Sequence, residues 1–372
     1  MPIVVFVLAA AVFAQGTSEF MLSGLLQQIA SACHVSLAAA GALTSLFAVG
    51  MVLGAPSMAM AAGAVPRRIA LPGFLGLFAA GHVVGALTTN FAVLLLTRLL
   101  AAVANAGFLA VALTALPGLV GVAAIGRATS IVLAGVTLAC IVGVPAGTVL
   151  GQALGWQAAF WAVALLACLA LIALALCSRG IQQQKTGPVI REWRVLRQSK
   201  LLGVIGVGVL VNGGTFAGFT YLGTIVGNTT APASPWIPVA LALFGAGSFA
   251  GVTFGARLPL LPTAFVLTGL WAATALLAHA LGALLVGVVL AGAGAFGAGS
   301  GVIATIVRLA APTAPRIAGA IATTAFNVGA VIGPAIAGLV VTDAVHASAA
   351  LWVSAAFTLA GCAATRTIRV TA

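Results

Sequence analysis

Two ionisable side chains stand inside long apolar segments, and they are the first residues of this chain whose chemistry needs an explanation. Glu19 is one of only three acidic residues among 372, and Arg98 is one of fifteen basic residues. A carboxyl group in such a place can bind and release a proton, and a nearby guanidinium would favour its charged form. Because burying either group in hydrocarbon is costly, each is a functional candidate by default.

The elements that carry these two residues are expected to be membrane-spanning helices. Hydrophobic residues make up 63% of the chain, charged residues make up 5%, and the mean hydropathy is +1.27. A water-soluble fold cannot bury that much apolar surface, so the composition predicts an all-α polytopic membrane protein. Apolar runs of about 20 residues predict twelve spans, at 3–25, 38–61, 70–90, 92–117, 128–152, 157–177, 201–225, 237–256, 263–281, 283–307, 317–341 and 348–365.

The distribution of basic residues predicts the orientation of these spans. With the N-terminus in the cytoplasm, 14 of the 15 Lys and Arg residues fall in cytoplasmic segments, and the remaining one is Arg98. Adding or removing one span would place the later arginines on the other side, against the positive-inside rule. We therefore expect a multi-pass protein of the plasma (inner) membrane with both termini in the cytoplasm. Basic residues that face an anionic leaflet also explain the net charge of +12 without any binding to nucleic acid.

Glu19 and Arg98 are expected at the same depth in the membrane. The first span runs outward and ends near Leu25, and the fourth runs inward and begins near Phe91. At about 1.5 Å per residue, both side chains lie about 9 Å below the outer surface, so an ion pair between them is feasible. Two interpretations stay open. The pair is either static and structural, or it contains a carboxyl group that is protonated when an arriving substrate separates it from the arginine.

Anchors that recur at a constant offset predict two similar halves. Arg127 and Arg316 begin the fifth and eleventh spans, 189 residues apart, and Pro145 and Pro334 are separated by the same distance. Such a repeat is expected of two six-helix halves related by an axis along the membrane normal. The predicted parts are an N-terminal six-helix half, a cytoplasmic linker and a C-terminal six-helix half, at 1–177, 178–200 and 201–372. Apolar and basic residues segregate to different helical faces in the linker, which predicts a short helix on the inner leaflet.

A stripe of glycines accompanies the first of these prolines. Gly143, Gly147 and Gly151 are spaced four residues apart around Pro145. Small residues on one face let two helices approach closely, and a proline inside a helix frees a backbone carbonyl and permits a bend. One interpretation is ordinary close packing. The other is that bent helices at the interface between the halves govern how the halves move.

The residue types argue against the common enzyme classes. The glycines at 292, 294 and 297 match a dinucleotide-binding fingerprint, but they lie inside an apolar helix with no acidic residue about 20 positions later. Neither lysine belongs to a phosphate-binding loop, and three scattered acids cannot build a metal-dependent catalytic site. We therefore expect no enzyme activity, no metal and no cofactor. The five cysteines and four histidines are interpreted as structural, and no histidine is expected to have an acidic partner.

Several motifs resemble those of one transporter family. Two segments resemble the opening of the major facilitator superfamily drug/proton antiporters, above all the actinobacterial chloramphenicol exporters: residues 15–25 (QGTSEFMLSGL) and 40–45 (AGALTS). Thr97-Arg98 with residues 105–110 (NAGFLA) is similar to the fourth-helix arginine motif of that family. Residues 143–156 (GVPAGTVLGQALGW) resemble its fifth-helix antiporter motif, and 325–334 its eleventh helix. The resemblance runs from about residue 3 to 360.

This resemblance implies a fold, a function and a set of site residues. It implies the major facilitator fold, with spans 1, 4, 7 and 10 around a central cavity, and proton-coupled export of a small drug, chloramphenicol first, by alternating access. The implied partners are the drug, protons and the lipid bilayer, and we expect a monomer. The site residues are Glu19 and Arg98 for proton coupling; Phe20, Asn105, Asn212, Phe216, Phe219, Tyr221, Phe326 and Asn327 for the substrate cavity; Gly143, Pro145, Gly147 and Gly151 in the antiporter motif; and Arg67, Arg68 and Arg127 at the cytoplasmic gate.

The chain departs from the family pattern in two loops. After the second span, the expected acidic residue and dense basic cluster are reduced to Pro66-Arg67-Arg68, and Gln27-Gln28 stand where the family has Pro-Asp. Part of the charge relay that holds the outward-open state in the family is therefore missing. Two alternatives stay open: a permease that exports a sugar or nucleoside, and a non-transporting paralogue that acts as a receptor or assembly partner.

Overall fold

The computed structural model describes residues 1–61, 66–121, 124–177, 190–255 and 260–370, and all regular elements within these ranges are helices. Eleven helical segments in this part are long and apolar enough to cross a membrane, and Pro262–Leu276 is a shorter apolar helix. Each of the twelve predicted spans falls on one of these segments. The expected all-α, twelve-span architecture is confirmed.

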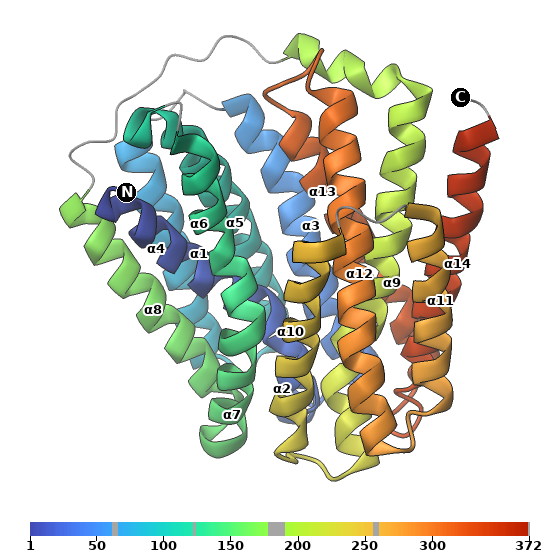
Figure 1. The fold of residues 1–372 in the computed structure, drawn as a ribbon. Coiled ribbons are helices and arrows are strands. Elements are labelled where there is room, and N and C mark those ends of the chain that lie inside the picture. Colours follow the sequence, from blue (N-terminus) through green and yellow to red (C-terminus); the bar gives the residue numbers. More distant parts are fainter. Residues whose placement is uncertain (62–65, 122–123, 178–189, 256–259, 371–372) are drawn as a thin grey trace.

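The N-terminal part of the chain forms a bundle of closely packed helices (Figure 1). Its elements are α1 (Ile3–Phe20), α2 (Leu22–Ala32), α3 (Leu37–Ala61), α4 (Arg67–Leu87), α5 (Phe91–Val120), α6 (Ile125–Leu138), η2 (Ala139–Gly143), α7 (Val144–Leu154) and α8 (Trp156–Cys177). A buried apolar cluster fills this bundle and consists entirely of residues between Val4 and Leu174. At Gly155 the backbone has a φ of +87°, which glycine adopts without strain, so that α8 begins directly after α7.

The C-terminal part forms a second bundle beside the first (Figure 1). Its elements are η4 (Ile190–Arg197), α9 (Ser199–Thr229), α10 (Trp236–Gly255), α11 (Leu260–Leu276), α12 (Leu281–Ala310), α13 (Ala318–Val340) and α14 (Ala349–Val370). Its apolar cluster also takes in residues of α1, α2, α3, η2 and α7. The division into halves at 178–200 stays a prediction, and residues 178–189 of that linker lie outside the described part of the chain.

Two of the spans are interrupted, and both interruptions have a local cause. The first span breaks at Met21 between α1 and α2, close to the point where Arg98 inserts its guanidinium against the Ser18 carbonyl. The fifth span contains a π-helical turn, η2, directly before Pro145. Proline has no backbone N–H and cannot continue the regular hydrogen-bond ladder, so the widened turn precedes it.

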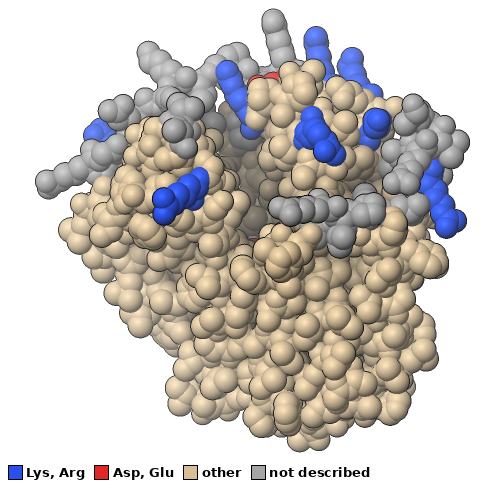
Figure 2. Space-filling model, viewed as in Figure 1, with Lys and Arg blue, Asp and Glu red and all other residues tan. Residues whose placement is uncertain are grey.

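The two bundles meet mainly at the end of the molecule away from the basic residues. There α3 packs on α13, α2 on α9, and α7 on α10. The Ser45 hydroxyl donates to the Val331 carbonyl at 3.0 Å, and the Gln152 amide donates to the Ser234 carbonyl at 3.1 Å. At the opposite end the Lys and Arg side chains gather, and the surface between the two lobes is hollowed (Figure 2). The labelled chain termini also lie toward this basic end (Figure 1).

The linker helix packs on the bundle. The predicted short helix is the 3-10 helix η4, in which Val195 is buried and Trp193 and Leu196 contact the C-terminal apolar cluster. Glu192 accepts the backbone N–H of Arg316 at 3.0 Å, and the Arg316 Nε lies 3.8 Å from the same carboxylate. The apolar side chains of η4 therefore pack on the C-terminal bundle, and contact of this helix with the inner leaflet stays a prediction.

Candidate functional site

Arg98 is held in place by the start of its helix. Asn90 caps α5, and its side-chain oxygen accepts the backbone N–H groups of Ala92 at 3.0 Å and Val93 at 3.2 Å. Such a cap satisfies donors that the first helical turn leaves free. From this fixed start, Arg98 lies two turns into the helix and points into the interior, where it is 1% exposed.

The Arg98 guanidinium is bound to α1 and stacked on α3. Its Nη1 donates to the Ser18 hydroxyl at 2.7 Å, and its Nη2 donates to the Ser18 carbonyl at 3.0 Å. The central carbon lies 4.3 Å from the centroid of the Phe47 ring, a cation–π distance. Its Nε has no hydrogen-bond partner within the described residues. Backbone, hydroxyl and aromatic contacts thus take the place of a direct carboxylate partner.

Ser18 also contacts a histidine that the sequence gave no reason to place here. The Ser18 Oγ and the His82 Nε2 are 2.6 Å apart, and the His82 Nδ1 lies 2.8 Å from the Phe78 carbonyl. Ser18 and His82 are 0% and 1% exposed. The ring of His82 packs between Phe78 and Phe160. The only indication in the sequence that His82 belongs to this site is that it is a polar residue in the middle of an apolar span.

Glu19 lies one residue after Ser18 and is half-buried. The Asn105 side chain and the Arg98 guanidinium both interact with its carboxyl group. The direct ion pairs among the described residues are Arg316–Glu192 and His346–Asp343, so Glu19 and Arg98 do not form one. The arrangement leaves the Glu19 carboxyl beside a positive charge and a neutral amide.

Three of the predicted cavity residues meet in an aromatic cluster. Phe20 lies 5.8 Å from Phe216 and 5.9 Å from Phe219 between ring centroids, and Phe216 and Phe219 are 6.3 Å apart. The cluster continues from Phe219 to Phe244 of α10 at 4.8 Å, and from Phe244 to Phe296 of α12 at 6.1 Å. It joins α1 to α9, so Phe20 is packed against the opposite bundle.

The other predicted cavity residues take different positions. Asn212 donates to the Phe326 carbonyl at 2.6 Å, and Asn327 donates to the Thr323 carbonyl of its own helix at 3.0 Å. Phe326 packs against the glycine faces of α9 and α12. Tyr221 is fully buried between α3 and α13, with its hydroxyl 3.5 Å from the Pro334 carbonyl. Tyr221 thus belongs to the contact between the bundles.

The glycine stripe of the antiporter motif faces α1 and α2. The side chains of Thr17, Met21 and Leu25 lie opposite Gly143, Gly147 and Gly151, respectively. Both sets repeat every four residues, so the two spans mesh along one line. This packing lies inside the N-terminal bundle, and the interpretation that bent helices at the interface govern how the halves move stays a prediction. Contact with the other bundle comes instead from Cys140, whose backbone lies against Gly245.

The three predicted gate arginines lie at the basic end of helices. Arg67 and Arg68 begin α4, and Arg127 lies in the first turn of α6. Arg68 and Arg127 are exposed, and Arg67 is half-buried. The structure does not test their role in gating.

A contact between an acidic residue and a histidine, Asp343 and His346, lies in the loop after α13. His346 Nδ1 lies 2.8 Å from Asp343 Oδ1, and the His346 backbone N–H donates to the same oxygen at 2.9 Å. The backbone donor, and to a smaller extent the imidazole, hold the pKa of the Asp343 carboxyl below its ordinary value. The expectation that no histidine has an acidic partner was therefore wrong for His346. No cluster of three metal-ligating side chains is found within the described ranges.

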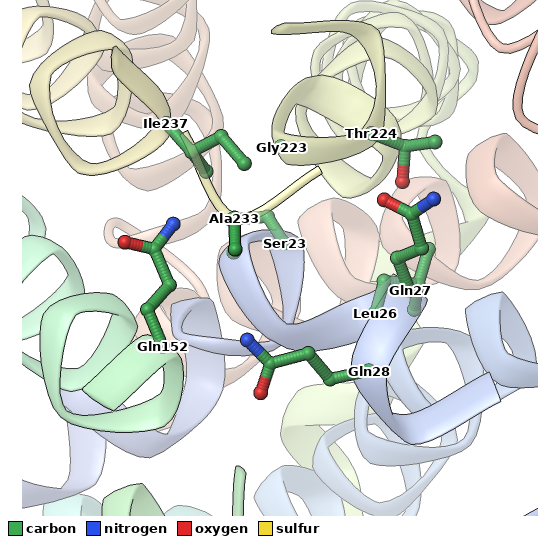
Figure 3. Close-up of a pocket in the computed structure, with 10 residues that line it drawn as sticks. Ser23, Leu26, Gln27, Gln28, Gln152, Gly223, Thr224, Ala233 and Ile237 are labelled. Carbon is green, nitrogen blue, oxygen red and sulfur yellow. The ribbon is translucent and has the colours of Figure 1, made fainter. Parts of the chain in front are cut away.

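A small polar pocket lies at the contact between the bundles (Figure 3). Gln27 and Gln28 of α2 and Gln152 of α7 point toward it, and Thr224 of α9 lies beside Gln27. Thr224 is 2% exposed, and its hydroxyl has no partner in the described part of the chain. The two glutamines that replace the family Pro-Asp thus line this pocket.

Comparison with known proteins identifies the family. A model of the Major Facilitator Superfamily matches residues 8–258. The chain is 47% identical over 337 residues to the chloramphenicol resistance protein of Streptomyces lividans, and this alignment covers 87% of this chain and 86% of that protein. It is also 32% identical to the inner membrane transport protein YdhP of Escherichia coli, over 68% of this chain and 64% of that protein.

Solved structures show the same fold. A bacterial homologue of the human lysosomal transporter Spinster, in an inward-facing and occupied conformation, superposes with a TM-score of 0.83 at 15% identity, covering 99% of this chain and 97% of that one. The nucleoside transporter NupG gives a TM-score of 0.75 at 13% identity, covering 98% and 99%. These two likenesses show that the chain has the same fold as both solved proteins. The chain therefore belongs to the major facilitator superfamily and is a membrane transporter of small molecules.

Proposed function

We propose that this transporter exports a small uncharged drug in exchange for protons, and that chloramphenicol is its first substrate. The observation that carries the proposal is the adjacency of Glu19 and Phe20 in α1. Glu19 faces Asn105 and Arg98 in the N-terminal bundle, and Phe20 packs on Phe216 and Phe219 of the other bundle. A molecule that entered the aromatic cluster would act on the same helical turn that carries the carboxyl group.

The side chains around this turn match an uncharged aromatic drug. The phenylalanine cluster offers ring faces and edges, and aromatic contacts of this kind contribute about 0.5–1.5 kcal/mol each beyond area burial. Asn105 and Asn212 supply amide groups that can bond to the hydroxyl and amide groups of chloramphenicol. The relative that is 47% identical is named for resistance to this drug, which supports the same choice.

The coupling follows from competition between drug and proton. Exchange of a neutral drug for a proton moves one positive charge inward, which is worth about 2.3 kcal/mol per 100 mV of membrane potential. Protonation would remove the attraction between Glu19 and Arg98 and favour release of the drug. Two protonation states of Glu19 would thus favour two arrangements of the bundles.

The arrangement of the bundles supports alternating access with the basic end in the cytoplasm. The bundles are joined at the far end by α3 with α13 and α2 with α9, and the molecule is hollowed at the basic end (Figure 2). We infer that the transporter is in an inward-open state. We also infer that it is a monomer in a bacterial plasma membrane, with both termini in the cytoplasm. Arg67, Arg68 and Arg127 would then flank the cytoplasmic opening.

The test is counterflow of labelled chloramphenicol in proteoliposomes that contain the purified protein. Vesicles preloaded with unlabelled drug should accumulate label transiently, and vesicles preloaded with a sugar or a nucleoside should not. Counterflow of a labelled sugar or nucleoside, without counterflow of chloramphenicol, would favour a different efflux permease. If no solute of these three classes exchanges, the chain is a non-transporting paralogue and the proposal fails.

A further inference from the structure

The chemistry of the groups around Ser18 determines which group donates in each hydrogen bond. Arg98 carries only donors, so the Ser18 hydroxyl oxygen accepts from Nη1. The hydroxyl proton of Ser18 is then free to donate to His82 Nε2, 2.6 Å away. The Phe78 carbonyl can only accept, so His82 Nδ1 carries the imidazole proton. This set of bonds describes a neutral His82 with one tautomer.

The network therefore runs in one direction, from Arg98 to Ser18, from Ser18 to His82, and from His82 to Phe78. Its members come from α5, α1 and α4, and Ser18 and His82 are separated by 64 residues in the chain. All three side chains are almost completely buried. In a buried network every member depends on the others, because a buried polar group that loses its hydrogen-bond partner has no water to replace it.

We propose that His82 is a positioning residue for proton coupling: through Ser18, it holds the Arg98 guanidinium on α1 and away from direct contact with the Glu19 carboxyl group. The inference rests on the proposed function, because it assigns to His82 a role at the proton-coupling pair of that function. The packing of His82 between Phe78 and Phe160 fixes its ring, and the Phe47 ring stacks on the Arg98 guanidinium at 4.3 Å.

Removal of His82 would release this arrangement. The Ser18 hydroxyl would lose its acceptor and turn to a carbonyl of its own helix, as serines in helices do. Arg98 would then keep at most one hydrogen bond to Ser18. Glu19 is the acidic residue with which Arg98 interacts electrostatically. The other titratable group that interacts with Glu19 is Cys140 of η2, which contributes no positive charge.

The test measures drug–proton exchange in proteoliposomes as a function of pH, at a clamped membrane potential, for wild type, His82→Leu and His82→Gln. In His82→Leu, direct pairing of Arg98 with the carboxylate should move the pH midpoint of exchange to lower pH by about one to three pH units. His82→Gln can place its Oε1 near the position of Nε2 and accept from Ser18, so it should keep the wild-type midpoint. His279→Leu, at an exposed position, is the matched histidine control.

The outcomes separate the inference from the function on which it rests. A structural defect alone would lower the rate at every pH and leave the midpoint unchanged, and that result in His82→Leu would overturn the inference. If His82→Leu does not fold, Ser18→Ala removes the same link, and an unshifted midpoint there would overturn it equally. A wild-type protein that exchanges drug at a rate independent of pH would overturn proton coupling itself, and this inference with it.

Discussion

Glu19 and Phe20 are consecutive residues of α1, yet their side chains contact different bundles. Glu19 interacts with Asn105 of α5, whereas Phe20 lies 5.8 Å from Phe216 of α9 between ring centroids. A helix turns by about 100° per residue, so two neighbours can point to two partners. This single turn therefore connects the group that can take a proton with the surface that can take a drug.

Replacing Glu19 by Gln should uncouple transport from the proton gradient. Glutamine has the shape of the protonated carboxyl but cannot release a proton, so the variant should lose uphill export and keep exchange of drug for drug. The measurement is drug accumulation in vesicles with an imposed pH gradient, with Asp343→Asn, an exposed acid in a loop, as control. If Glu19→Gln still concentrates the drug, the coupling proton is carried elsewhere.

Replacing Phe216 by Ala should weaken drug binding and leave coupling intact. The loss of aromatic contacts worth about 0.5–1.5 kcal/mol predicts a KM that is higher by about two- to tenfold. Phe249→Ala is the matched control, since Phe249 is 53% exposed on α10, away from the cluster. Initial rates of transport against drug concentration decide the question. Equal KM values for the two variants would show that the cluster does not contact the drug.

The glycine stripe predicts that replacement by alanine destabilises the protein at one of its glycines and not at the next. A β-carbon added at Gly143 would collide with the Thr17 side chain, and overpacking of this kind costs about 1–3 kcal/mol. A β-carbon at Gly147 would lie 3.7 Å from that of Met21, an ordinary contact. Gly143→Ala should therefore lower the unfolding temperature in detergent, and Gly147→Ala should not. A larger side chain, as in Gly147→Leu, should block the approach of α1 and abolish export.

The charge distribution predicts which loops are accessible from outside the cell. In a background without the five native cysteines, a cysteine at Thr230 should react with an impermeant thiol reagent added to whole cells. A cysteine at Lys200 should react only after the cells are opened, because that residue belongs to the basic end. Both positions are exposed, so burial cannot explain a difference. Labelling at 200 in intact cells would contradict the N-inside orientation.

The Asp343–His346 contact predicts a pH effect outside the membrane spans. The His346 backbone N–H holds the pKa of Asp343 below its ordinary value of 3.8. A lowered folded-state pKa adds stability above the unfolded value, and that stability is lost as the pH falls through the folded value. An NMR titration should show a midpoint below 3.8 for Asp343, retained largely in His346→Ala. In His346→Pro the backbone donor is gone, and the midpoint should rise.

The sequence by itself determined the class of fold and the positions of the spans. Hydropathy and helix length are local properties, so the twelve apolar runs could be read without knowledge of their neighbours. The family was recognisable for the same reason, because its motifs around Glu19, Arg98 and Pro145 are contiguous in the chain.

Only the tertiary structure decided which buried polar groups meet. Equal depth made a direct pair of Glu19 with Arg98 feasible, but depth does not fix the rotation of a helix about its axis. Packing of α5 on α1, and of α4 on α5 and α8, brings His82 and Arg98 to Ser18 from 64 and 80 residues away. The partners of Tyr221 and Gly143 likewise depend on which helix lies opposite. Hydrogen bonds need atoms within about 3 Å, and no local pattern in a sequence specifies distances between helices that are far apart in the chain.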